Sequence, residues 1–274
     1  MSAYLQVTDL HTHFHPKTSV FGARRDPVKA VNGVSFSLDK GEILGLVGES
    51  GCGKSTLSRT IMQLVPPTSG HIVLDGIDFV TLSKAELRRS RLDFQMVFQD
   101  PYASLNPRHT VFSTIAEAIR QRHPNTTGEP LTQKVTELMQ RCGLNPRAMR
   151  KYPHEFSGGQ RQRIAIARAL APEPKLLIAD EPVSALDVSI QSQILNLLKQ
   201  LVSDLDLTMV FISHDLSVVR YIADRIAVMH FGKLVEVGPA EEVMDSPRHD
   251  YTKTLLSAIP RIDVDSIRGR LATA

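Results

Sequence analysis

The chain has 274 residues, 42% of them hydrophobic and 22% charged, with 32 Lys and Arg against 29 Asp and Glu. These proportions exclude a wholly disordered chain, and the length allows one large domain or two small ones. A net charge of +3 gives no broad attraction for nucleic acid, and aromatic residues at 5% without Trp disfavour stacking on single strands. We therefore predict no nucleic-acid partner.

Hydropathy and cysteine content exclude two further classes. No stretch reaches the about 18 apolar residues that a membrane-spanning helix needs, so the chain is not expected to span a bilayer by itself. Cys52 and Cys142 have neither the spacing of metal ligands nor the number needed for a disulfide framework. A chain of this kind suits a reducing compartment.

Short apolar runs alternate with amphipathic stretches, which predicts an α/β fold. In chain order, strands are expected at Val31–Leu38, Glu42–Val47, His71–Asp75, Phe94–Phe98, Lys175–Ala179 and Thr208–Ser213. Helices are expected at Lys54–Val65, Ser189–Leu205 and Leu216–Ile222. A hairpin is expected at Ile226–Val237, with its turn at Phe231-Gly232, and the segment after Pro260 has no clear period.

Between about Pro101 and Arg168 the chain is predicted to be largely helical. Amphipathic stretches at 111–122 and 131–144 are separated by a polar linker at 123–130. A further helix is expected to begin with Ser157 as its N-cap. The simplest organisation is an α/β core interrupted by this helical insertion.

A glycine-rich segment directly follows the second expected strand and opens the first expected helix. It matches G-x-x-x-x-G-K-[ST] in the strand–loop–helix context that this phosphate-loop pattern requires. The backbone N–H groups of such a loop surround phosphate oxygens, its lysine reaches the β- and γ-phosphates, and its serine hydroxyl ligates Mg²⁺. The predicted ATP-binding residues are Gly48, Glu49, Ser50, Gly51, Cys52, Gly53, Lys54, Ser55 and Thr56.

Two carboxylates follow the apolar run at 176–179. A buried strand that ends in Asp180 delivers this carboxylate beside the phosphate loop, where it can hold Mg²⁺ through water. Glu181, one residue later, is placed to polarise an attacking water. A surface acidic pair is the alternative for an isolated Asp-Glu, but a phosphate loop in the same chain favours the catalytic interpretation.

The segment Phe156–Gln160 has the sequence FSGGQ and resembles the signature motif of ABC-type ATPases. Its helix N-terminus carries a serine hydroxyl and glycine amides, which suit a γ-phosphate. In this family the motif completes the site of a facing subunit, so the resemblance implies that ATP is sandwiched between two protomers. The resemblance extends from about Leu5 to Pro260, and its signature residues are Ser157, Gly158, Gly159 and Gln160.

Other positions match the same family in the same order along the chain. Gln99 matches the Q-loop glutamine, which touches Mg²⁺ and water, and His214 matches the switch histidine that contacts the γ-phosphate. The D-loop, which crosses the dimer interface, matches Ser184, Ala185, Leu186 and Asp187. The resemblance implies two sets of residues, namely catalytic Glu181, His214 and Gln99, and the Mg²⁺ ligands Ser55, Gln99 and Asp180.

The implied fold is an α/β P-loop NTPase core of the ABC ATPase type. It carries a small antiparallel β subdomain and an inserted helical signature subdomain, here at about residues 101–168. We expect the nucleotide-binding domain to occupy residues 1–260, followed by a C-terminal tail at 261–274.

Segments at 97–108, 180–198 and 249–260 resemble the ATP-binding subunits of dipeptide and oligopeptide importers, and are closer to the second of their two paralogous ATPases. The resemblance implies a heterodimer with a sibling ATPase, or a homodimer of the isolated chain. It also implies two transmembrane permeases and, indirectly, a substrate-binding protein. Such a subunit is peripheral to the cytoplasmic face of a bacterial or archaeal plasma membrane.

This sequence departs from the pattern of the importer ATPases at two points. Many relatives place a cysteine cluster for an iron–sulfur centre just after the segment that matches Ser257–Pro260, but Arg261–Ala274 contains no Cys. We therefore predict no iron–sulfur cluster. The aromatic residue that stacks on adenine is assigned to Phe21, with Phe14 and Tyr4 as alternatives, because an extra segment precedes Val28.

Alternative functions remain within the wider family. The cargo could be nickel or an antimicrobial peptide, or the chain could serve an exporter, because cargo does not touch this subunit. A soluble ABC ATPase that acts on DNA or ribosomes is disfavoured by a single ATPase half, the lack of sustained heptads and the near-neutral charge. A degenerate ATPase that only docks is disfavoured by the presence of Lys54, Asp180, Glu181 and His214.

Overall fold

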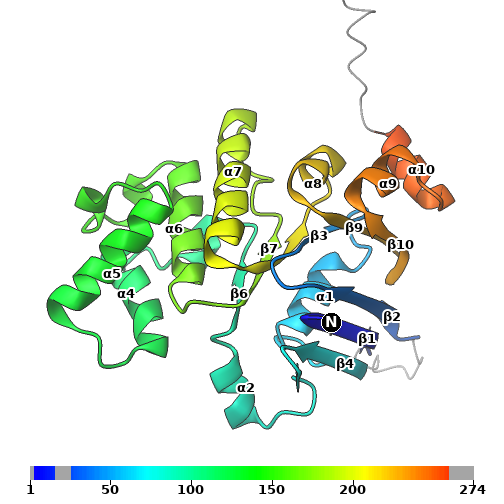
Figure 1. Cartoon of the computed structure of the whole chain (residues 1–274), viewed down its shortest axis with the longest axis horizontal. Coiled ribbons are helices and arrows are strands. Elements are labelled where there is room, and N and C mark those ends of the chain that lie inside the picture. Colours follow the sequence, from blue (N-terminus) through cyan, green and yellow to red (C-terminus); the bar gives the residue numbers. More distant parts are fainter. Residues whose placement is uncertain (1–2, 16–25, 259–274) are drawn as a thin grey trace, which may run out of the picture.

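A computed structural model describes residues 3–15 and 26–258 (Figure 1). Its strands are β1 Leu5–Phe14, β2 Val28–Leu38, β3 Ile43–Val47, β4 Ser69–Leu74, β5 Ile77–Asp78, β6 Phe94–Val97, β7 Leu176–Asp180, β8 Thr208–Ile212, β9 Arg225–His230 and β10 Lys233–Pro239. Its α-helices are α1 Lys54–Ile61, α2 Lys84–Ser90, α3 Pro101–Ser104, α4 Val111–Arg122, α5 Gly128–Arg141, α6 Gly158–Leu170, α7 Val188–Leu205, α8 Leu216–Ile222, α9 Ala240–Asp245 and α10 Asp250–Ser257. Two 3₁₀ turns lie at Pro146–Ala148 and Pro153–Glu155.

The larger sheet has six strands in the order β10-β9-β3-β8-β7-β6. The pairs of β3 with β8 and β9, and of β7 with β6 and β8, are parallel, whereas β10 is antiparallel to β9. Strands β3, β7 and β8 are buried along their whole length, as expected for parallel strands that are covered on both faces. The carboxyl ends of the five parallel strands therefore meet at one edge, which we call the carboxyl edge.

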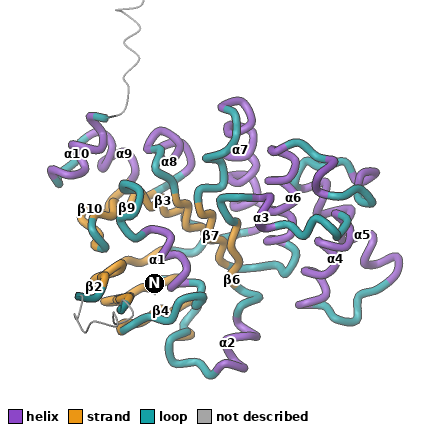
Figure 2. Tube along the Cα trace, turned by 180° about the vertical axis from the view of Figure 1, so that it is seen from behind, coloured by secondary structure: helices purple, strands orange, loops and turns teal. Residues whose placement is uncertain are grey.

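The smaller sheet is antiparallel, with the order β2-β1-β4-β5. Helix α1 lies between the two sheets (Figures 1 and 2) and buries Leu57 and Ile61 in a core shared with both of them. The expected antiparallel β subdomain is confirmed by this sheet. The sequence pattern did not predict β1, because Asp9 has a φ of +46° and the pairing register shifts between Val7 and Leu10, which interrupts the alternation of buried residues.

The opposite face of the six-stranded sheet packs against α6, α7 and α8. Residues such as Ile164, Ile194 and Val219 from these helices share one core with the sheet and with α4 and α5. The helices between β6 and β7 form the predicted helical insertion, which lies to one side of the two sheets (Figure 1). The predicted mixed α/β fold class is thereby confirmed, and the boundary of the C-terminal tail lies outside the described residues.

The predicted strands and the β9–β10 hairpin are all present, with ends that differ by a few residues. Helix α1 ends at Ile61 rather than Val65, because Gln63 adopts a left-handed φ of +52°. The N–H groups of Leu64 and Val65 then turn back to the carbonyl of Arg59. Helix α5 begins at residue 128, three residues before the predicted start, with Pro130 in its first turn, where a missing N–H costs little.

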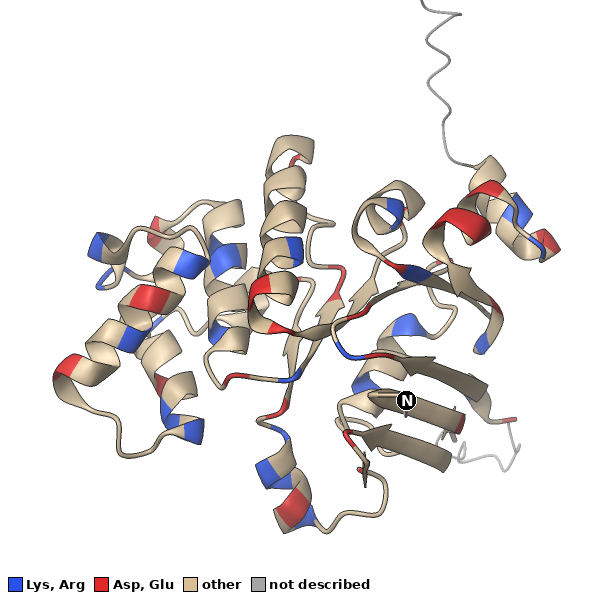
Figure 3. Cartoon of the chain, viewed as in Figure 1, with Lys and Arg blue, Asp and Glu red and all other residues tan. Residues whose placement is uncertain are grey.

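Helices α2, α9 and α10 were not predicted, and each has eight residues or fewer. Helix α2 does carry a local signal, since Ser83 and Glu86 form a reciprocal capping box. Both signs of charge are distributed over the helical insertion, the loops around the sheets and the C-terminal helices (Figure 3), in keeping with the net charge of +3. No helix in the described ranges is long and apolar enough to cross a membrane.

Candidate nucleotide-binding site

The predicted site residues gather at the carboxyl edge because each follows a parallel strand. The glycine-rich loop follows β3, Gln99 follows β6, Asp180 ends β7, and His214 lies two residues after β8. Open α/β sheets place their ligand sites at this edge of the sheet. The topology therefore brings together four segments that are far apart in the sequence.

The backbones of two strands, β2 and β9, pack closely against the glycine-rich loop. A Cβ atom on Gly53, whose φ is +115°, would lie 2.1 Å from the carbonyl oxygen of Ala30 in β2. A Cβ atom on Gly48 would lie 2.2 Å from the carbonyl oxygen of Met229 in β9. The loop thus needs glycine at these two positions both for its conformation and for the close approach of other backbone.

Lys54 turns its ammonium group back into the loop. Its Nζ donates to the carbonyl oxygens of Gly48, at 2.6 Å, and Glu49, at 2.9 Å, and the side chain is buried. Lys54 is also the first residue of α1, so the loop leads into a helix N-terminus, where backbone N–H groups and the helix dipole favour an anion. A buried cation beside these donors makes the loop suited to phosphate.

Asp180 lies at the end of β7 and is buried, with its Oδ1 atom lacking a hydrogen-bond partner. Burial, reinforced by the adjacent charge of Glu181, raises the pKa of the Asp180 carboxyl. The Ser55 hydroxyl and the charges of Arg59 and Lys54 act in the opposite direction. A buried carboxylate oxygen without a partner is a group that a bound cation would satisfy.

Glu181 is the convergence point of the predicted catalytic residues. Its Oε2 atom accepts a hydrogen bond from Gln99 Nε2 at 3.1 Å and lies 3.3 Å from His214 Nδ1. Its backbone has a φ of +48°, an unusual conformation for glutamate that is held by its N–H donating to the carbonyl of Ile212. The structure therefore brings Glu181, Gln99 and His214 together, as the sequence predicts.

The signature segment begins α6 as predicted. Ser157 Oγ accepts from the backbone N–H of Gln160, and Gln160 Oε1 accepts from the N–H of Ser157 at 3.0 Å, which forms a capping box. Among the hydrogen bonds and ion pairs of residues 3–15 and 26–258, none joins residues 157–160 to the phosphate loop at 48–56. This segment and the loop of the same chain are therefore not brought together directly.

The predicted D-loop, Ser184–Asp187, lies between β7 and α7. Ser184 Oγ donates to the carbonyl of Glu181 at 3.1 Å, and Asp187 is the N-cap residue of α7. Gln191, which sequence reasoning missed, donates its amide to the carbonyls of Val183 and Leu186. The D-loop is thus held close to Glu181 by contacts within its own chain.

Two more residues that the sequence analysis missed connect to the loop and to the segment after Gln99. The hydroxyl of Tyr251 in α10 accepts from the backbone N–H of Glu49 at 3.1 Å. The guanidinium of Arg161 in α6 lies over the ring of Tyr102, 3.8 Å from its centroid. Neither contact has a local sequence signal, because each depends on how separate elements pack.

The adenine-stacking prediction, Phe21, falls outside the described residues. Of its alternatives, Tyr4 lines a cavity at the opposite edge of the six-stranded sheet, where the parallel strands begin, which we call the amino edge. This edge lies away from the loop. Phe14, the last residue of β1, pairs with Val28 in β2. Val28 lies two residues before Ala30, whose carbonyl oxygen is packed against Gly53 of the loop. Phe14 is therefore the alternative that lies on the nucleotide side.

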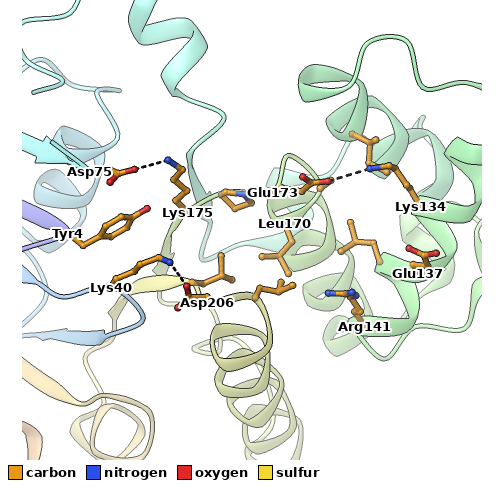
Figure 4. Close-up of a pocket in the computed structure, with 16 residues that line it drawn as sticks. Tyr4, Lys40, Asp75, Lys134, Glu137, Arg141, Leu170, Glu173, Lys175 and Asp206 are labelled. Carbon is orange, nitrogen blue, oxygen red and sulfur yellow. Dashed lines mark hydrogen bonds and ion pairs between the residues drawn. The ribbon is translucent and has the colours of Figure 1, made fainter. Parts of the chain in front are cut away.

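A cavity of about 760 Å³ lies at the amino edge, between the smaller sheet, α5 and the strand ends that precede β7 and β8 (Figure 4). Three ion pairs join charged residues of its lining, namely Lys40–Asp206, Lys175–Asp75 and Lys134–Glu173. None of its lining residues belongs to the predicted nucleotide site. Cavity size alone does not identify the functional site in this protein.

A phosphate loop at the carboxyl edge of a parallel sheet, with a buried carboxylate and a glutamate beside it, is the arrangement of a P-loop nucleotide site. The family model described as ABC transporter matches residues 31–184, and the model described as oligopeptide/dipeptide transporter, C-terminal region, matches residues 235–273. The chain belongs to the ABC transporter family, as an ATP-binding cassette with ATPase activity. The predicted resemblance is confirmed.

Curated relatives match over most of the chain. It is 54% identical to the oligopeptide transport ATP-binding protein AppF of Bacillus subtilis, covering 93% of this chain and 78% of that protein. It is 50% identical to the oligopeptide transport ATP-binding protein OppF of Escherichia coli, covering 95% of this chain and 79% of that protein.

Solved structures agree with the fold. A dimeric, post-hydrolysis ATP-binding cassette, MJ0796, bound to ADP and Pi, superposes with a TM-score of 0.75 at 29% identity, covering 86% of this chain and 98% of that one. The structure of cbiO1 from Clostridium perfringens, part of the ABC transporter complex cbiONQ, gives a TM-score of 0.77 at 27% identity, covering 97% of this chain and 100% of that one.

Proposed function

We propose that the chain is the ATP-hydrolysing subunit of an oligopeptide importer. The observation that carries this proposal is the combination of a phosphate loop, Asp180 and Glu181 at the carboxyl edge with a C-terminal segment, residues 235–273, of the oligopeptide/dipeptide transporter type. The relatives named above are oligopeptide transport ATP-binding proteins, which supports the same cargo.

The loop at residues 48–56 binds the phosphates of ATP. Lys54 supplies a buried positive charge, and the loop amides together with the N-terminus of α1 supply hydrogen-bond donors. The Lys54 ammonium has three donors, of which two are used by the carbonyls of Gly48 and Glu49, so one remains for a phosphate oxygen. A hydrogen bond to this charged acceptor is stronger than one to a neutral carbonyl.

The residues present fit a Mg²⁺ ion that accompanies ATP. The Oδ1 atom of Asp180 is buried and has no hydrogen-bond partner. Ser55 follows Lys54 in the first turn of α1, and Gln99 lies two residues after β6, the strand next to β7. In the described ranges, no cluster of three or more His, Cys, Asp or Glu forms a separate metal site. Mg²⁺ in nucleotide sites needs few protein ligands because phosphate and water supply the others. When bound, the ion neutralises charge on the β- and γ-phosphates.

Glu181 acts on the water that attacks the γ-phosphate. Its carboxylate is largely buried and is oriented by Gln99 and His214, so that one oxygen is held while the other remains available to accept from water. Gln99 and His214 are exposed and come from different strands, so they can respond to groups that arrive from outside the chain. A positioned base of this kind typically contributes about 10²–10⁴-fold to the rate.

The signature residues 157–160 complete the nucleotide site of a facing ATPase subunit, and the D-loop at 184–187 crosses the interface with it. This proposal is supported by the lack of direct contact between residues 157–160 and the loop of the same chain in the described ranges. The dimeric state of the MJ0796 cassette supports it further. The facing subunit is a sibling ATPase in the importer, and a second copy of this chain in isolation.

The remaining partners are two transmembrane permeases at the cytoplasmic face of a bacterial or archaeal plasma membrane and, indirectly, a substrate-binding protein. The segment after Gln99 contacts the permeases. Tyr102 in this segment is 63% exposed, and its ring contacts the guanidinium of Arg161 in α6. A permease that displaces Tyr102 would therefore also displace a residue of the signature helix. We expect no nucleic-acid partner.

Affinity purification from membranes tests this proposal. The chain should be recovered with a sibling ATPase and two permeases, and the purified complex should hydrolyse ATP faster when an oligopeptide and its binding protein are added. Recovery with ribosomes or DNA instead of membrane proteins would contradict the proposal. Stimulation by nickel instead of peptide would overturn the cargo and leave the ATPase assignment in place.

A further inference from the structure

Helix α10 reaches the phosphate loop from the far end of the chain. The hydroxyl of Tyr251 accepts a hydrogen bond from the backbone N–H of Glu49 at 3.1 Å, across 202 positions of sequence. Tyr251 lies within the C-terminal region of the oligopeptide/dipeptide transporter type, which begins at residue 235. The contact therefore joins the nucleotide site to the part of the chain that is particular to peptide transporters.

The bonded N–H belongs to the same peptide unit whose carbonyl accepts from Lys54. The carbonyl of Gly48 and the N–H of Glu49 form one planar trans peptide, so they point in opposite directions. The carbonyl accepts from Lys54 Nζ at 2.6 Å on the inside of the loop, and the N–H meets Tyr251 on the outside. Tyr251 and Lys54 thus contact the two polar groups of one peptide unit.

Tyr251 is itself held in place by its ring. The ring stacks on His230 with a centroid separation of 3.7 Å and an interplanar angle of 19°. His230 is the last residue of β9, which pairs with the strand that leads into the loop. The phenol is therefore supported by the sheet, and burial raises its pKa, so the hydroxyl stays protonated at neutral pH.

The start of α10 is anchored independently of the loop. The carboxylate of Glu236 in β10 accepts from the backbone N–H groups of Arg248, at 2.8 Å, and His249, at 3.0 Å. His249 is the N-cap residue of α10, and its Nδ1 accepts from the N–H of Tyr251. This chain of contacts runs from β10 through the start of α10 to the phosphate loop.

The turn after β9 holds the other side of the loop. The N–H of Gly232 donates to the carbonyl of Cys52 at 2.9 Å. The loop is thereby bonded at Glu49 by Tyr251 and at Cys52 by the β9–β10 turn. Both bonds join backbone groups of the loop to segments outside it, namely α10 and the β9–β10 turn.

We propose that Tyr251 is a positioning residue for nucleotide binding, which holds the Gly48–Glu49 peptide so that Lys54 and the loop amides are preorganised for phosphate. The inference rests on the proposed function only through ATP binding at residues 48–56. A loop that is already ordered loses less conformational freedom when ligand binds, which raises affinity. Removal of the hydroxyl should therefore weaken ATP binding more than it slows hydrolysis.

Tyr251→Phe in the full chain tests this role, because it removes the hydroxyl and keeps the ring on His230. Calorimetric titration with MgATP should give a Kd about 3- to 10-fold above that of the wild-type chain, as expected for loss of one hydrogen bond that organises the loop. In the assembled transporter the KM for ATP should rise by a similar factor, with kcat within about twofold.

The matched control is Tyr221→Phe, which removes the hydroxyl that contacts Asn196, away from the loop. Its Kd for MgATP should equal that of the wild-type chain. A Tyr251→Phe variant with wild-type Kd, or one that loses kcat with KM unchanged, would overturn the inference alone. A wild-type chain that binds no MgATP would overturn ATP binding and the inference together.

Discussion

His214 Nδ1 lies 3.3 Å from Oε2 of Glu181, although the two residues follow different strands of the six-stranded sheet. The contact arises because β7 and β8 are adjacent and parallel, so the residues after their carboxyl ends are neighbours. Gln99, after β6, donates to the same oxygen. The side chains of Gln99 and His214 thus converge on the carboxylate of Glu181, which is the group that we propose activates water.

Glu181→Gln should separate binding from hydrolysis. Glutamine keeps the shape of the side chain but lacks the basicity that proton transfer requires, so ATP affinity should stay within about twofold while turnover falls by about 10²–10⁴-fold. Phosphate release by the assembled complex measures this, with the corresponding glutamate of the sibling ATPase also replaced. Glu173→Gln, at the amino edge, is the control and should retain turnover. Near-normal hydrolysis in the Glu181 variant would remove it from this role.

Lys54→Ala should abolish most of the nucleotide affinity. The substitution removes the buried cation that we place on the phosphates, whereas the loop backbone and α1 remain. The increase in melting temperature that MgATP gives the wild-type chain should therefore disappear in the variant. Lys84→Ala, in the exposed helix α2, serves as the control and should keep the full increase. A wild-type response in Lys54→Ala would contradict the assignment.

Gly53→Ala should lower the free energy of unfolding by more than the strain of a positive φ alone would. A Cβ atom at this position would lie 2.1 Å from the carbonyl oxygen of Ala30, so β2 or the loop must move. Gly76→Ala is the matched control, because Gly76 also has a positive φ, +79°, but its Cβ atom would meet nothing within 4 Å.

The control should cost about 1–2 kcal/mol, the usual strain of a left-handed non-glycine residue. Gly53→Ala should exceed it by about 2 kcal/mol or more in urea unfolding and should also weaken MgATP binding. Equal losses of unfolding free energy in the two variants would show that the contact with β2 imposes no requirement on the loop.

Asp180→Asn should stabilise the nucleotide-free chain at neutral pH. Because the pKa of Asp180 is raised in the folded state, the folded protein binds this proton more tightly than the unfolded chain does. The Asp180 contribution to the free energy of unfolding therefore falls as pH rises from the unfolded-state pKa of about 3.9 through the raised folded-state pKa. Asparagine does not titrate, so it avoids this loss of unfolding free energy. The excess of the variant's unfolding free energy over that of the wild-type chain should therefore be larger at pH 7.5 than near pH 4.

Thermal unfolding of both chains across this pH range measures the effect. With MgATP bound, the wild-type chain should be the more stable of the two, because its Asp180 carboxylate gains a cation and the asparagine does not. Asp204→Asn, at an exposed position, should stay within about 0.5 kcal/mol of wild type throughout. An Asp180→Asn variant that is less stable than wild type at pH 7.5 without nucleotide would show that Asp180 has a stabilising partner in the free chain.

Much of the site could be predicted from the sequence because its motifs are local. The phosphate loop has its pattern within eight residues, and the carboxylates follow directly on an apolar strand. Their convergence was also accessible, since parallel strands share an edge. By contrast, β1 escaped prediction because a left-handed residue, Asp9, breaks its alternation.

The contacts that support the site depend on tertiary packing. Nothing near Tyr251 in the sequence indicates that its hydroxyl meets Glu49, because the contact requires β10 to place α10. The unusual backbone of Glu181, with a φ of +48°, is likewise a result of the strand neighbour that bonds its N–H. Local patterns identify the groups that do chemistry, and packing decides how they are held.

The most direct test of the account measures uptake of a labelled oligopeptide by cells that lack this chain. The wild-type chain should restore uptake when it is supplied again. The Glu181→Gln chain should assemble with the same membrane partners and restore none, because the import cycle stops before hydrolysis. Uptake that persists without the chain, or that Glu181→Gln restores in full, would contradict the claim that ATP hydrolysis at this site powers peptide import.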